Sequence, residues 1–84
     1  NLSQNYPNPF NPSTKIDFEL PVDGNVSITL FDISGRMVAT MMNEFKSAGY
    51  YTIGFNASNL SSGIYFYRLQ APGFNKVMKM TLIK

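Results

Sequence analysis

Short segments in which apolar and polar residues alternate run through most of this chain. Between Thr14 and Leu20, for example, Ile16, Phe18 and Leu20 alternate with charged residues. A period of two is typical of a β-strand that buries one face. Further segments of this kind follow at intervals of roughly ten residues, separated by Gly, Pro and Asn. The pattern predicts an all-β protein, an antiparallel sandwich of about six short strands.

Six segments are expected to be strands: 14–20, 26–31, 36–42, 50–56, 64–70 and 77–83. Segment 64–70 is apolar on both faces, which predicts a central strand. Segment 36–42 is ambiguous, because its Met and Val residues, together with Phe45, also fit a helical spacing. Its marginal length, the flanking Gly35 and Gly49, and the strands around it favour a strand.

The first thirteen residues have a different composition, in which three prolines are spaced by Asn or Phe. Proline disfavours both a helix and a sheet ladder, so this stretch is expected to be extended, with Asn turns. Tyr6 and Phe10 are too apolar for a free linker and should hold it against the edge of the domain. The predicted organisation is therefore an Asn/Pro-rich strap or linker, residues 1–13, followed by a single β-sandwich domain, residues 14–84.

Composition argues against an enzyme. The 84 residues include no Cys and no His, which removes the commonest general base, the best nucleophile and nearly every zinc or iron site. Asp17 and Glu19 share a strand face that should be solvated, which does not suit the carboxylate pair of a glycosidase. Asp23 and Asp32 lie in turns and are too few for a calcium site. We predict no catalytic residue, no metal and no cofactor.

The net charge of +2 comes from scattered basic residues, whereas nucleic-acid-binding proteins usually carry a dense basic stripe. We therefore expect no nucleic-acid partner. No apolar run approaches the roughly 18–20 residues of a membrane span. The first residues show neither a signal-peptide pattern nor an initiator Met. We expect a piece of a longer protein, in which an export signal could lie upstream.

The tyrosines offer two further readings. Tyr65 follows Leu60-Ser61-Ser62-Gly63-Ile64, which is similar to the approach to a tyrosine corner, where the hydroxyl bonds to backbone a few residues upstream. Tyr65 is therefore expected in the core or at such a corner. Tyr50, beside the inward-facing Tyr51, is the better candidate for an exposed ring. An exposed ring of this kind could stack on a sugar, so a surface glycan is a possible partner.

Four stretches of the sequence, taken together, point to one family. They are Asn5-Tyr6-Pro7-Asn8-Pro9-Phe10-Asn11-Pro12, Leu30-Phe31-Asp32-Ile33-Ser34-Gly35-Arg36, Leu60-Ser61-Ser62-Gly63-Ile64-Tyr65 and Met80-Thr81-Leu82-Ile83-Lys84. This combination closely resembles the type A C-terminal sorting domain of the bacterial type IX secretion system, over essentially the whole chain. The immunoglobulin-like domain of the flagellar hook-capping protein has similar strand patterning. One departure is Phe31, where a Tyr is common in the family.

The resemblance implies an immunoglobulin-like sandwich of seven strands, so the expected fold is an immunoglobulin-like antiparallel β-sandwich of about six to seven strands. It also supports a strand over residues 36–42. It further implies a non-catalytic signal that the outer-membrane type IX translocon recognises on an upstream cargo domain of the same chain. The cargo then passes through the periplasm and is secreted or held at the bacterial cell surface. There a sortase-like peptidase removes the signal and attaches the cargo to an anionic lipopolysaccharide.

The residues that match the family motifs, together with the basic last strand, are expected to form the sorting and recognition surface. They are Pro7, Asn8, Pro9, Asp32, Gly35, Arg36, Gly63, Tyr65, Lys76, Lys79 and Lys84. A purely structural role is the alternative for each: the glycines shape turns, Asp32 pairs with Arg36, and the lysines keep a sheet edge soluble. Two other functions stay open, namely a carbohydrate- or cell-wall-binding sandwich appended to a secreted hydrolase, and a structural immunoglobulin-like spacer.

Overall fold

The computed structural model describes residues 2–84, which form six strands and no helix. The strands are β1 (Ser13–Leu20), β2 (Gly24–Asp32), β3 (Met37–Lys46), β4 (Gly49–Asn56), β5 (Gly63–Ala71) and β6 (Phe74–Leu82). The pairings among these six strands are antiparallel, which confirms the predicted all-β, immunoglobulin-like sandwich. Over the described residues, no helix is long and apolar enough to cross a membrane.

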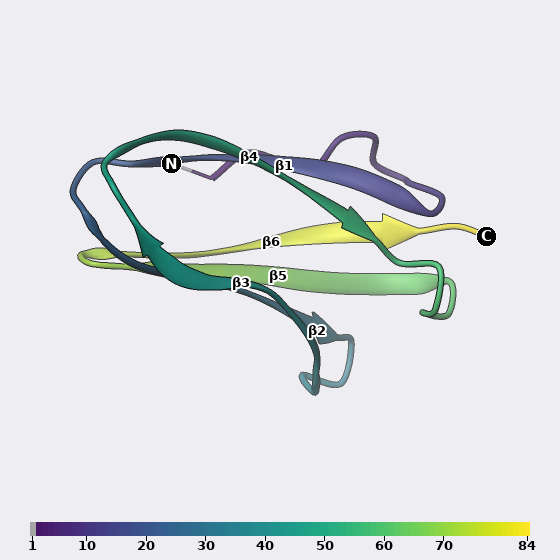
Figure 1. The fold of residues 1–84 in the computed structure, drawn as a ribbon. Coiled ribbons are helices and arrows are strands. Elements are labelled where there is room, and N and C mark those ends of the chain that lie inside the picture. Colours follow the sequence, from purple (N-terminus) through teal and green to yellow (C-terminus); the bar gives the residue numbers. More distant parts are fainter. Residues whose placement is uncertain (1) are drawn as a thin grey trace.

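The strands form two layers. β1 pairs with β4 in a two-stranded sheet, and the second sheet has the order β3-β2-β5-β6. The smaller sheet lies over the larger one, and the segment from β3 to β4 crosses between them (Figure 1). β5 pairs on both sides, with β2 and with β6, which confirms the prediction of a central strand.

The core lies between the two layers because β1, β2, β4 and β5 alternate as the sequence predicts. Ile16, Phe18 and Leu20 of β1 are buried against the inner face of the larger sheet. The inner faces of β2, β5 and β6 supply Val26, Ile28, Leu30, Tyr65, Tyr67, Leu69, Met80 and Leu82. Tyr51, Ile53 and Phe55 of β4 are only partly buried, since the smaller sheet has just two strands.

The Met-rich segment is strand β3, as predicted, and the structure explains its helix-like spacing. Met42 pairs with Ile28 and Thr40 with Thr29, so Met41 is an extra residue in the ladder. A second irregularity lies next to Phe31. An extra residue lets two neighbours point toward the same side of a strand. As a result, the adjacent pairs Val38–Ala39 and Met41–Met42 are all partly buried.

The strap packs against both layers. Its first residue, Asn1, lies outside the described residues, and its last, Ser13, begins β1. Leu2 pairs with Phe18 and Tyr6 with Lys15 on β1, whereas Phe10 pairs in parallel with Leu82 on β6. Leu2, Asn5 and Phe10 are buried, while Tyr6 is 45% exposed. Phe10 therefore anchors the strap as expected, and Tyr6 holds it through backbone pairing and its hydroxyl.

Candidate recognition surface

The turn after β2 is organised by the side chain of Asp32. Its Oδ1 accepts hydrogen bonds from the Ser34 backbone N–H (2.9 Å), the Ser34 hydroxyl (2.6 Å) and the Arg36 backbone N–H (3.0 Å). The Ser34 hydroxyl and then the Arg36 N–H favour the charged carboxylate, so they lower the pKa of Asp32. The Asp32 carboxylate thus bonds to the backbone N–H of Arg36. The guanidinium of Arg36 is exposed and takes no part in this hydrogen bond.

Gly35 completes this turn with a φ of 87°, a left-handed conformation that residues with a Cβ rarely adopt. Its N–H donates to the Asp32 carbonyl at 3.0 Å. A Cβ at Gly35 would meet nothing within 4 Å, so the requirement for glycine is purely conformational.

We expect Gly35→Ala to lower the free energy of unfolding by about 1–2 kcal/mol, the cost of a Cβ in left-handed backbone. Each kcal/mol should lower Tm by about 4–8 °C in a domain of this size. Gly54→Ala is the matched control, because a Cβ there also meets open space but the φ is not positive. Equal melting temperatures for the two variants, followed by circular dichroism, would contradict this reading.

Tyr65 forms the tyrosine corner that the sequence predicts. It is buried on β5, and its hydroxyl donates to the Ser61 carbonyl at 2.6 Å, four residues upstream. Gly63 begins β5, two residues before it. Because the Tyr65 ring is buried, a partner would contact the residues around it and not the ring itself.

Pro7, Asn8 and Pro9 lie on the surface of the strap beside the end of β6. The Asn8 side-chain oxygen accepts a hydrogen bond from the Thr81 N–H at 2.9 Å. Phe10 donates its N–H to the Thr81 carbonyl and accepts one from Ile83, both at 3.0 Å. The strap thus covers the outer edge of β6 in this part, so a partner cannot add a strand there without displacing it.

The three lysines of the predicted surface are all exposed but differ in their surroundings. Lys84 reaches the loop before β5, where its Nζ donates to the Ser58 carbonyl at 2.6 Å and its N–H to the Ser62 hydroxyl at 3.0 Å. Lys79 lies opposite Phe66, near the middle of β6, and Lys76 lies opposite Leu69, toward the β5–β6 turn.

The strand register gathers most of the predicted residues at one end of the sandwich. Asp32 pairs with Tyr65, and Gly63 pairs with Leu82, two residues before Lys84. The β2–β3 turn, the start of β5 and the end of β6 all lie at this end (Figure 1). The strap joins them there through Asn8. Lys76 lies toward the opposite end, beside the β5–β6 turn.

A match to a protein family accompanies this geometry. The family described as the secretion system C-terminal sorting domain matches residues 4–84. The chain belongs to this family. No curated protein and no solved structure matches the chain. The sorting domain is thus a type IX secretion signal, and its family implies export through the periplasm to the medium or the cell surface.

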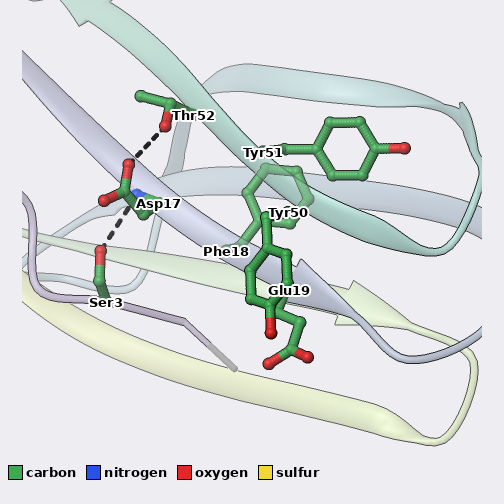
Figure 2. A pocket seen from close by; sticks show the side chains of 7 residues that line it. All are labelled: Ser3, Asp17, Phe18, Glu19, Tyr50, Tyr51 and Thr52. Carbon is green, nitrogen blue, oxygen red and sulfur yellow. Dashed lines mark hydrogen bonds between the residues drawn. The ribbon is translucent and has the colours of Figure 1, made fainter.

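The sorting domain also has the exposed tyrosine that the sequence suggested as a sugar platform. Tyr50 is 82% exposed and projects from β4 beside its cross-strand partner Glu19 (Figure 2). Both line a shallow hollow of about 280 Å³ whose floor includes Phe18 and Tyr51, with ring centroids 5.4 Å apart. A single exposed ring beside this hollow offers one stacking face.

Asp17, in the same hollow, serves to hold the strap. Its Oδ1 accepts hydrogen bonds from the hydroxyls of Thr52 (2.6 Å) and Tyr6 (3.0 Å), and its N–H donates to the Ser3 hydroxyl (3.0 Å). The bond to Asp17 raises the pKa of the Tyr6 phenol, because the neutral hydroxyl is the donor. The described residues contain no group of three or more acidic side chains that could bind a metal.

Sequence reasoning missed the pair that fixes the strap in the sorting domain, Asn5 and Tyr67. The Tyr67 hydroxyl accepts the Asn5 backbone N–H (2.8 Å) and donates to the Ser3 carbonyl (2.7 Å). The Asn5 side chain in turn donates to the Pro7 carbonyl and the Thr14 hydroxyl, both at 3.1 Å. One signal was available: Tyr67 lies on the inward face of a central strand, and a buried tyrosine hydroxyl needs a partner.

Proposed function

We propose that this sorting domain is a non-catalytic module that directs an upstream cargo protein through the outer membrane by type IX secretion and on to cell-surface attachment. The match of the sorting-domain family to residues 4–84 carries this proposal. The proposed partners are the outer-membrane translocon and a sortase-like peptidase that separates domain from cargo. The strap precedes the sandwich and packs against it. The peptidase would therefore cleave either upstream of the strap or after the strap has been released from the sandwich.

The gathering of motif residues at one end of the sandwich supports a recognition role for them. The Asp32–Arg36 turn presents an exposed Arg36 on a backbone that four hydrogen bonds and the conformation of Gly35 hold in place. A cation presented from a fixed backbone in this way suits recognition, because little backbone entropy is lost on binding.

A fusion experiment tests the proposed function. Residues 1–84 are attached to the C-terminus of a periplasm-targeted fluorescent protein, in a bacterium with an active type IX system. We expect fluorescence in the medium or on the cell surface, and retention in the periplasm of a strain that lacks the translocon. Equal release from both strains would overturn the proposal, and so would retention of a folded fusion in the active strain.

Variants for this assay must keep the fold. Removing residues 80–84 would delete Met80 and Leu82, which are fully buried, so that truncation would test folding rather than recognition. Substitution of the exposed Arg36 avoids this problem. The carbohydrate-binding alternative predicts glycan-array binding that Tyr50→Ala abolishes, and the spacer alternative predicts neither export nor sugar binding.

A further inference from the structure

The charges of this chain are separated along its length. All five acidic residues lie between Asp17 and Glu44, while five of the seven basic residues lie from Lys46 to Lys84. The fold turns this separation into a difference between surfaces, because β5 and β6 contain Arg68, Lys76 and Lys79 and no acid.

The outward face of β2, β5 and β6 combines two of these cations, Arg68 and Lys79, with apolar side chains that are partly or largely exposed. In the strand register Phe31 lies beside Phe66, Phe66 beside Lys79, and Arg68 beside Val77. We call these five residues the Arg68 face. Val77 is 52% exposed, and four of the five, all but Lys79, line a hollow of about 340 Å³ that extends to the Asp32–Gly35 turn.

Arg68 has an unusual environment at the centre of this face. Its guanidinium carbon lies 5.1 Å from the centroid of the Phe31 ring, and its Nε is buried without a hydrogen-bond partner. The ion pair found within residues 2–84 joins Lys46 to Glu44 instead. A partly buried arginine is normally matched by an acid, because its guanidinium binds carboxylates in a two-pronged geometry. The counter-ion is therefore expected from a partner.

The Asp32 carboxylate borders the same hollow but is already committed to its turn, where its Oδ1 accepts three hydrogen bonds. Because the Ser34 hydroxyl and the Arg36 N–H lower its pKa, it stays charged and repels an anion at that end. An acidic group on a partner would thus bind toward Arg68 and Lys79. Two cations around apolar side chains are too sparse for a membrane surface, whose recognition uses clusters of about 4–8 basic residues.

We propose that the Arg68 face is the docking surface for an acidic protein partner in the export machinery. The partner places carboxylates against Arg68 and Lys79 and an apolar side chain against Phe66 and Val77. This inference rests on the proposed function and assigns it to a surface that lies outside the family motifs except at Phe31. Of the residues of this face, only Lys79 belongs to the recognition surface expected from the sequence. Charge complementarity of this kind chiefly governs partner choice and association rate.

The test uses the fluorescent fusion with Lys79→Glu, Arg68→Gln and the double variant Arg68→Gln/Lys79→Glu. We expect the double variant to reduce translocon-dependent export by about tenfold or more, as loss of close interfacial charge pairs does. Lys15→Glu is the matched control, an exposed lysine on the other sheet, and should stay within about twofold of wild type. Thermal melting of each purified domain identifies any variant that fails to fold. Because Lys79 is exposed, Lys79→Glu is expected to fold and tests the inference even if Arg68→Gln does not fold.

The outcomes separate this inference from the function on which it rests. If the wild-type fusion is exported and the folded double variant is exported equally well, the docking face is wrong and the sorting function stands. If Lys15→Glu reduces export as strongly as Lys79→Glu, export depends on the overall charge of the domain and not on the Arg68 face. That result also overturns the inference. If the wild-type fusion itself shows no translocon-dependent export, the sorting function fails first.

Discussion

Replacing Phe10 with Ala is expected to lower the free energy of unfolding by about 3–5 kcal/mol, the usual cost of deleting a buried phenylalanine ring. Phe10 is only 3% exposed, although it lies in the Pro-rich strap. Its ring fills the core beside Leu82, and its backbone makes two hydrogen bonds to the end of β6. A loss of this size is a large part of the stability of an 84-residue domain, roughly 4–13 kcal/mol.

Urea denaturation followed by circular dichroism measures this effect, with Phe45→Ala as the control. Phe45 is 66% exposed at the end of β3, so its loss should change stability by no more than about 0.5 kcal/mol. Similar midpoints for Phe10→Ala and wild type would show that the strap is a detachable linker and not part of the folded core.

The second large effect is expected from Tyr67→Phe. The buried hydroxyl bridges Asn5 and Ser3, and its removal leaves a buried Asn5 N–H without an acceptor. An unsatisfied buried group costs about 1–3 kcal/mol. Tyr50→Phe serves as the control, since it removes a hydroxyl from an exposed side chain. Equal stabilities of the two variants would show that the bridge contributes nothing to the fold.

The same tyrosine predicts a dependence on alkaline pH. Burial raises the pKa of Tyr67 from 10.0 to about 12, against a smaller lowering by the Asn5 N–H. The folded state therefore holds this proton where the unfolded state has released it, and stability falls as pH rises from 10 to about 12. Tyr67→Phe should flatten this part of the profile. If stability falls as steeply with pH in the variant as in wild type, a group other than Tyr67 causes the fall.

The strands could be predicted because alternation is a local property of the sequence. Segment 14–20 shows its buried face directly in Ile16, Phe18 and Leu20. β3 was harder, because the extra residue Met41 breaks the period of two and produces a spacing that also suits a helix. The flanking glycines and the family resemblance favoured a strand over a helix for this segment, and the strand is correct. The last strand begins at Phe74, three residues before its predicted start, since Pro72-Gly73 makes a tight turn.

The candidate site was predictable only in its local parts. The Asp32 turn and the Tyr65 corner are closed by residues within four positions of each other, so their spacing is visible in the sequence. The contacts of Asn8 with Thr81 and of Asn5 with Tyr67 join residues more than 60 positions apart. No local pattern encodes such contacts. The buried Arg68 Nε without a hydrogen-bond partner is likewise visible only in the folded structure.

The bonds between the strap and β6 have a consequence for biosynthesis. Phe10 can form its two backbone hydrogen bonds only after Thr81 and Ile83 have left the ribosome. The strap therefore packs into place only after the last strand has been synthesised. A translation product that stops before these residues would carry a loose strap and an unfinished core. Folding of the domain therefore depends on synthesis of its last strand, because only a chain synthesised at least through Ile83 can assemble the signal properly.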